Sequence, residues 1–200
     1  SKTSDFLVKR LIEILGIIFV ILSILLFLSL ITYSTEDPNF IYSGNENINN
    51  ILGFRGSFVS DFFFQSIGLM SFLFSTSIFF IGINIILKKK LLIIVENFFY
   101  IILYSLIGTL FLSNYYNTSF SLPINGNGGF VGNMLAKSFL EKIILEGDKI
   151  SYSILLILVF FFFFLSVNFK LKFFVSRLKR FNDKNNINNR DKNINQIYDN

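Results

Sequence analysis

Four long apolar stretches constrain the fold of this chain more than any other feature of its sequence. Residues 14–35, 62–87 and 150–169 contain no charged side chain, and residues 91–113 contain only Glu96. About 20 apolar residues in a helix span the ~30 Å hydrocarbon core of a bilayer, so each stretch is long enough to cross it once. A soluble domain of 200 residues has no place to hide four such segments.

We therefore predict an all-α integral membrane protein with four transmembrane helices. The predicted four-span membrane domain covers residues 11–170, between a short cytoplasmic N-terminus over 1–10 and a C-terminal segment over 171–200. The predicted spans lie at about 11–33, 62–87, 91–113 and 150–169.

Lysine and arginine are distributed unevenly between these stretches and predict an orientation. Cytoplasmic loops are enriched in basic residues, and the basic counts before, between and after the four spans run 3, 1, 3, 3 and 8. The compact turn Lys88–Lys90 and both termini are therefore predicted to be cytoplasmic (N-in/C-in), and the two longer loops external. The third loop is neutral overall, and its three lysines are balanced by three acids. Residues 171–200 begin as a basic juxtamembrane segment, and their Asn-rich, aromatic-poor remainder is typical of a disordered linker.

The composition excludes most catalytic chemistry. The chain has no Cys and no His, which removes disulfides, thiol nucleophiles, Cys/His zinc sites and Ser-His-Asp triads. No phosphate loop, dinucleotide fingerprint, HExxH or GxSxG motif is present. We therefore predict no catalytic residue, no metal site and no cofactor in this chain.

A few charged side chains lie near the predicted membrane boundaries. Arg10 and Glu13 are spaced i, i+3 and are expected to pair on one face of the first helix. Glu96 lies about one turn into the third span, and we interpret it as an interfacial carboxylate near the lysine turn. A transport role for Glu13 and Glu96 is the functional alternative, because carboxylates inside a membrane often mark ion paths. The interfacial charges are thus Arg10, Glu13, Lys88, Lys89, Lys90 and Glu96.

The two external loops contain the residues that suit tight turns. In the first loop Asp37-Pro38 ends the first helix, Gly53 and Gly56 suit close backbone turns, and residues 57–65 are expected to begin the second helix outside the membrane. In the second loop a glycine-rich turn precedes a predicted short amphipathic helix over about 130–146, which could lie on the membrane surface or pack on the first loop. Asp148 is a candidate N-cap for the last span.

These loops also resemble a known family. The segments Asp37-Pro38, Asn50-Ile51-Leu52-Gly53-Phe54-Arg55-Gly56 with Asp61 following, and Gly128-Gly129-Phe130-Val131-Gly132 resemble the loop motifs of the FtsK/SpoIIIE family of septal DNA translocases. The resemblance covers nearly all of residues 9–170, with the spans in the same order and spacing. Two departures occur: Asn39-Phe40 replaces the usual Ser-Trp, and Ser57 and Ser60 replace two alanines.

The resemblance implies a function for this chain, which its composition alone does not indicate. It implies the inner-membrane anchor and divisome-interaction domain of a translocase at the bacterial division septum, with other division proteins, the lipid bilayer and further copies of the chain as partners. The ATP-driven motor, with ATP, magnesium and DNA, would lie outside this chain, which looks like an excised piece. The candidate external-loop structural or interaction residues are Asp37, Pro38, Asn50, Gly53, Gly56, Asp61, Gly128, Gly129 and Gly132.

Two other function classes stay open on the sequence. A small four-helix transporter or channel would use Glu13 and Glu96, although no charge lies at mid-depth to build a conduction path. A membrane enzyme would need Ser/Lys or Asp pairs, and no clear pair is present.

Overall fold

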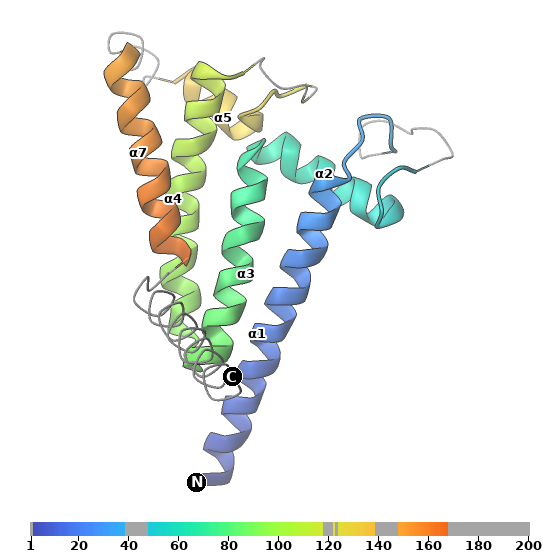
Figure 1. The fold of residues 1–200 in the computed structure, drawn as a ribbon, viewed down its shortest axis with the longest axis vertical. Helices are drawn as coiled ribbons and strands as arrows, with labels where there is room; N and C mark the ends of the chain where they lie inside the picture. The colour runs from blue at the N-terminus through green and yellow to red at the C-terminus, as the bar shows by residue number, and fades with distance from the viewer. Residues whose placement is uncertain (1, 39–47, 118–121, 123, 139–147, 168–200) are drawn as a thin grey trace, which may run out of the picture. The chain divides into compact units, whose positions relative to one another are not determined.

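The computed structural model describes residues 2–38, 48–117, 122, 124–138 and 148–167, and within these residues it is all-helical (Figure 1). All of its helices belong to one compact unit that covers Ser1–Asn168. The predicted C-terminal segment over 171–200 lies outside the described residues. The helices are α1 (Lys2–Ile31), α2 (Gly53–Ile67), α3 (Met70–Lys88), α4 (Leu92–Tyr115), α5 (Gly129–Ala136) and α7 (Asp148–Val167).

Four of these helices are long and apolar enough to cross a membrane, as the sequence predicts. They are the segments Asp5–Ile31, Met70–Lys88, Leu92–Tyr115 and Lys149–Val167, which contain 19 to 27 residues each. At 1.5 Å per residue, 19 residues extend about 28 Å, close to the hydrocarbon thickness. In the bundle α1 packs mainly on α3 and α4 on α7, while α3 also contacts α4 (Figure 1).

Small and hydroxyl-bearing residues bring α1 and α3 into close contact. A Cβ atom at Gly82 would lie 2.7 Å from the carbonyl oxygen of Gly16, so only glycine fits at this crossing. Two turns farther along, the Ser75 hydroxyl donates to the carbonyl oxygen of Ser23 at 2.8 Å. Helices in lipid associate through such close packing and interhelical hydrogen bonds, because lipid tails are as apolar as leucine and supply no hydrophobic driving force.

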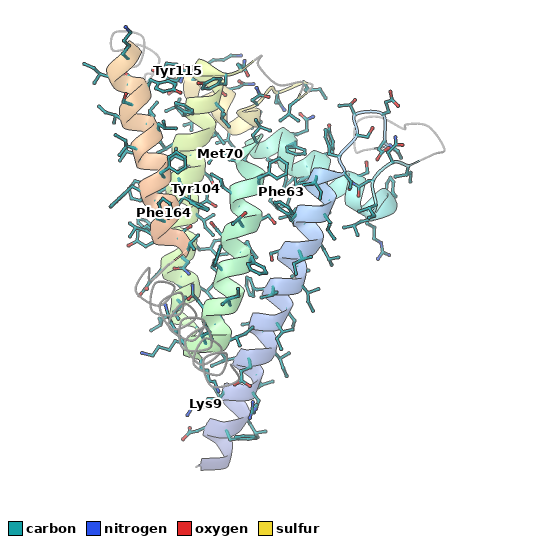
Figure 2. The ribbon with its side chains drawn as sticks, in the orientation of Figure 1. Lys9, Phe63, Met70, Tyr104, Tyr115 and Phe164 are labelled. Atoms are coloured by element: carbon teal, nitrogen blue, oxygen red, sulfur yellow. The ribbon has the colours of Figure 1, made fainter. Side chains whose placement is uncertain are left out.

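A buried polar contact also joins the other three spans. The Ser77 hydroxyl of α3 shares hydrogen bonds with the Tyr104 hydroxyl of α4 at 3.0 Å and with the Ser166 hydroxyl of α7 at 2.9 Å. Tyr104 is fully buried, between Met70 and Phe164 in the view of Figure 2. Tyr104 belongs to the same buried apolar cluster as Ile81 of α3, Ile101 of α4 and Val159 of α7, and this cluster joins the three helices.

The structure corrects the prediction of a single helix over 62–87. The helix breaks at Gly68 and Leu69, and residues 62–67 belong to α2, which begins at Gly53 rather than within 57–65. Gly68 has φ +57°, and a Cβ there would overlap the carbonyl group of Asn127. The Leu69 N–H donates to that carbonyl oxygen at 2.9 Å. The chain therefore turns at Gly68 because a loop distant in sequence approaches its backbone too closely for a side chain.

The predicted amphipathic helix over 130–146 is only partly described. The structure has a helix of 8 residues here, α5, from Gly129 to Ala136, and it packs on α4 and α2. Residues 139–147 lie outside the described residues, so the remainder of that helix stays a prediction. Asp148 is the first residue of α7.

Candidate functional site

The predicted loop residues gather at one end of the bundle, where α1 ends and α3 begins; we call it the loop end. Figure 1 shows α2 and α5 at this end. The predicted residues form two groups: the Asp37 cluster, which contains Asp37, Pro38, Asn50, Gly53, Gly56 and Asp61, and the glycine cluster, which contains Gly128, Gly129 and Gly132. Gly68, which was not predicted as a site residue, belongs to the glycine cluster as well. Helix α2 contacts both groups.

Asp37 organises the first loop around a fully buried carboxylate. Its two oxygens accept hydrogen bonds from the backbone N–H groups of Asn49 and Asn50, each at 2.8 Å. The Asn49 side-chain amide adds a third bond to Asp37 at 3.1 Å. Hydrogen bonds to an ionised acceptor are roughly twice as strong as those between neutral groups, and they allow this carboxylate to be buried. Asp37, in the segment that follows α1, is thereby tied to residues 49 and 50, which lead into α2.

Asn50 connects this loop to the end of α1. Its side-chain amide donates to the carbonyl oxygens of Ser29 at 2.9 Å and Thr32 at 3.3 Å. The last carbonyls of a helix have no partner within the helix, so Asn50 satisfies groups that α1 leaves open. Its side-chain oxygen accepts the N–H of Leu52 at 3.1 Å, and its backbone carbonyl accepts the N–H of Gly53 at 2.8 Å. The second bond shapes the turn that starts α2.

Gly56 is the point of closest approach between α2 and the end of α1. The Ser29 hydroxyl donates to the Gly56 carbonyl oxygen at 2.6 Å. A Cβ at Gly56 would overlap the Asn50 side chain and lie 2.6 Å from the Leu52 Cβ. At Gly53 the reason for glycine differs, because a Cβ there would meet open space but φ is +63°. Pro38 joins this cluster through its carbonyl oxygen, which accepts the Ser57 hydroxyl at 2.9 Å.

Asp61 is the second buried carboxylate of the cluster. The Tyr33 hydroxyl donates to its Oδ1 at 3.1 Å, and the Gln65 amide approaches the same oxygen at 3.5 Å. Burial, reinforced by the negative charge of Asp61, raises the pKa of Tyr33 well above its usual value. Tyr33 therefore stays protonated and keeps donating its hydrogen bond, while its ring packs on Phe64 with centroids 4.9 Å apart.

The glycine cluster lets the second loop pack against α2 and α4 without side chains. Cβ atoms at Gly128 and Gly132 would both press against the Thr109 carbonyl group and the Ser113 hydroxyl of α4. A Cβ at Gly129 would lie 2.6 Å from the Gly68 nitrogen, and φ at Gly129 is +66°. The repeated glycines thus reflect direct backbone contact between the loop, the helix break and α4.

Several polar residues of this cluster were not predicted as site residues. The Asn133 amide donates to the Asn125 carbonyl oxygen at 2.7 Å, and Asn133 Oδ1 accepts the Ser113 hydroxyl at 3.2 Å. The Asn125 amide donates to Gln65 Oε1 at 3.0 Å, so Gln65 lies between Asn125 and Asp61 and links the two clusters. Asn127, fully buried, donates to the Tyr116 carbonyl oxygen.

The interfacial charges lie at the opposite end of the bundle, where α3 meets α4. Arg10 Nη1 and Glu13 Oε2 are 2.5 Å apart, in agreement with their i, i+3 spacing. Glu13 Oε1 also lies 2.5 Å from Lys89 Nζ, which joins α1 to the turn after α3. The lysine turn thus pairs through Lys89 with Glu13. Glu96 is exposed on α4, in no ion pair with another described residue.

Hydrogen bonds within the fold occupy the two buried carboxylates of the loop end. The oxygens of Asp37 and Asp61 accept hydrogen bonds from the surrounding loop and helix residues. Among the described residues no group of three or more acidic side chains is placed to hold a metal ion. The arrangement holds the described parts of the two loops against one end of the helix bundle.

Together the helices and the loop end define a multi-pass helical membrane domain. The family described as the 4TM region of DNA translocase FtsK/SpoIIIE matches residues 8–179, and the chain belongs to this family. The DNA translocase FtsK of Rickettsia bellii (strain RML369-C) is 31% identical over 120 residues, which are 58% of this chain and 15% of that protein. This chain therefore corresponds to a small part of that relative. No solved structure matches the chain.

Proposed function

We propose that this chain is the inner-membrane anchor and divisome-interaction domain of a DNA translocase that couples cell division to chromosome segregation. Membership of the FtsK/SpoIIIE four-helix family supports the anchor role, and the four helices of membrane-spanning length and composition agree with it. The Rickettsia relative is a DNA translocase, and the matched region covers 15% of its length. We place the motor, with its ATP, magnesium and DNA, outside this chain, and we assign no catalysis to the chain itself.

The observation that carries the interaction role is the fixed geometry of the loop end. Asp37 and Asp61 are 0% and 3% exposed; Asp37 accepts hydrogen bonds from the far end of the first loop, and Asp61 accepts one from Tyr33, which follows α1. A surface that is ordered before binding loses less conformational entropy when a partner docks. A bare anchor needs only the four spans, so we propose that the loop end engages other division proteins and further copies of the chain.

The proposed topology has the loop end outside and the Lys89 end in the cytoplasm. The basic turn Lys88–Lys90 follows α3, and Arg10 and Lys89 both pair with Glu13 at that end. Residues 1–10 are then cytoplasmic, 11–170 form the membrane domain, and 171–200 lead toward the motor. The proposed location is the bacterial inner membrane at the division septum.

Localisation of the chain in dividing cells tests the interaction role. We expect a fluorescent fusion of the chain to collect at midcell, and Gly56→Ala to reduce that enrichment because it displaces the first loop. Glu36→Gln, at an exposed neighbour of Asp37, serves as the matched control and is expected to localise normally. Uniform peripheral fluorescence of the unmodified chain would contradict the proposal, and normal membrane insertion of each variant is checked by fractionation.

The structure favours the anchor over a transporter. Glu13 is paired with two cations, and Glu96 lies near the same end of the bundle. Between these carboxylates and the loop end, the described parts of α1, α3, α4 and α7 contain no acidic side chain except Asp148 at the start of α7. Ion flux in proteoliposomes that disappeared with Glu96→Gln would support the transporter instead.

A further inference from the structure

Helix α2 lies across the end of the bundle rather than along it. The α1–α3 contacts pair Gly16 with Gly82 and Ser23 with Ser75, and this antiparallel register places Gly68 opposite Leu30. The N-terminal end of α2 lies at the same height along α1, because the Ser29 hydroxyl donates to the carbonyl oxygen of Gly56. Both ends of α2 therefore lie level with the last turn of α1, and Figure 1 shows α2 crossing α1 there.

The membrane boundary passes near this level. The uncharged part of α1 extends from Ile14 to Ile31, about 27 Å at 1.5 Å per residue, which is close to the hydrocarbon thickness. Ser29 is within one turn of the end of α1 at Ile31. A helix of 15 residues held at that depth lies in the plane of the membrane, close to the boundary between the acyl chains and the headgroups.

Contacts on opposite sides of α2 show how the helix is rotated. On one side Ser57, Asp61 and Gln65 are bonded to Pro38, Tyr33 and Asn125, which belong to the two loops. On another side Phe63 packs on Phe74 of α3, with ring centroids 5.2 Å apart. Figure 2 shows Phe63 in the region between α1 and α3. Since Phe74 lies one turn inside the start of α3, the Phe63 side of α2 faces the membrane interior.

An exposed strip of α2 adjoins Phe63. Arg55, Val59 and Phe62 follow one another at i, i+4 and i+7 and share one face of the helix. Val59 is 38% and Phe62 61% exposed, and Arg55 is exposed and forms no ion pair with another described residue. The Phe62 ring contacts the Phe63 ring, with centroids 5.8 Å apart, so the strip borders the side of α2 that faces the membrane interior.

We propose that the strip of Arg55, Val59 and Phe62 is a phospholipid-binding face at the loop end. Val59 and Phe62 enter the acyl region, where removing their apolar surface from water is favourable. Arg55 reaches a lipid phosphate, because a long basic side chain at the boundary can extend its charge to the headgroups. The strip is continuous with the apolar faces of the spans, which favours lipid over a protein partner as its occupant. Helix α2 thereby holds the two loops at a fixed height above the bilayer.

A single tryptophan tests this proposal, because the chain contains none of its own. We expect Phe62→Trp, in the full chain reconstituted in phosphatidylcholine vesicles, to show blue-shifted emission. Lipids brominated near the headgroup end of the acyl chain should quench that emission more strongly than lipids brominated near the methyl end. Aqueous iodide should have little effect. Phe62 is exposed, so the variant is expected to fold.

Two other positions calibrate the measurement. Phe99→Trp, at a 59% exposed position of α4, reports lipid contact of a membrane-spanning helix, and Phe64→Trp, at a 4% exposed position of α2, reports a site shielded by protein. Strong quenching of Phe62→Trp by iodide, with no quenching by brominated lipid, would place the strip in water and leave it to a protein partner. That result would overturn the proposal. If neither iodide nor brominated lipid quenched the emission of Phe62→Trp, as is expected for Phe64→Trp, that result would also contradict the proposal.

Discussion

The hydroxyl of Ser29 donates a hydrogen bond to the carbonyl oxygen of Gly56, 2.6 Å away, and this contact joins a membrane-spanning helix to one that does not span. Ser29 is 1% exposed, and Gly56 has no side chain to separate the two backbones. The same carbonyl oxygen also accepts the Ser60 hydroxyl at 2.9 Å. The position of α2 relative to α1 is therefore set by small residues packed around one backbone oxygen.

Replacing Gly56 with alanine is expected to destabilise the loop end. The added Cβ would overlap the Asn50 side chain and the Leu52 Cβ, and Asn50 would lose its bonds to α1. Overpacking of a well-packed site costs about 1–3 kcal/mol, which should appear as a lower thermal midpoint in detergent. Gly53→Asn is the matched control, because a Cβ there meets open space and asparagine tolerates the positive φ. Equal midpoints for Gly56→Ala and Gly53→Asn would contradict this account.

Replacing Asp37 with asparagine is expected to loosen the first loop. The carboxylate accepts the backbone N–H groups of Asn49 and Asn50, and a side-chain amide can accept only one of them while turning its NH₂ toward the other. An unsatisfied buried donor costs about 1–3 kcal/mol. Thermal unfolding measures the loss, and hydrogen exchange at Asn49 and Asn50 locates it. Glu36→Gln removes a neighbouring exposed carboxylate, so it should change neither quantity; if it matches Asp37→Asn, net charge rather than hydrogen bonding is responsible.

Replacement by alanine is expected to affect stability very differently at two glycines of the spans, Gly82 and Gly108. At Gly82 the new Cβ would meet the backbone of α1, 2.7 Å from the Gly16 oxygen and 2.9 Å from the Val20 nitrogen. At Gly108 it would meet only the Met70 side chain, which is flexible and can move away. Gly82→Ala should therefore lower stability by about 1–3 kcal/mol, and Gly108→Ala much less. Thermal unfolding of both variants in the same detergent measures the two losses of stability. A larger loss for Gly108→Ala would mean that α1 does not pack on α3 through Gly16.

The proposed topology predicts the activity of reporter fusions. An enzyme that works only outside the cytoplasm should be active when fused after Asn45, in the first loop, and inactive when fused after Lys89. The physical reason is the retention of basic residues in the cytoplasm, and the Lys88–Lys90 turn carries three of them. Activity after Lys89 with none after Asn45 would reverse the orientation of the whole domain.

The sequence predicted the contacts that depend on local spacing. The Arg10–Glu13 pair follows from two residues on one helix face, and the structure contains it. The second partner of Glu13 could not be predicted, because Lys89 reaches Glu13 only when α1 packs on α3. In the same way the Asp-Pro and glycine motifs marked the two loops, but nothing in them indicated that Gln65 lies between Asp61 and Asn125.

The sequence by itself determined that this chain has four helices able to cross a membrane, because length and hydrophobicity are properties of each segment alone. It also determined the family, through short motifs in the loops. The tertiary structure decided where the second span begins, because residues 62–87 contain no charged side chain and a glycine at position 68 does not by itself interrupt a helix. Helix α2 ends at Gly68 since the Asn127 carbonyl group and Gly129 approach that backbone from a loop about 60 residues away. Only the packed structure brings those atoms together, and it therefore places residues 62–67 in α2 and not in the expected second span.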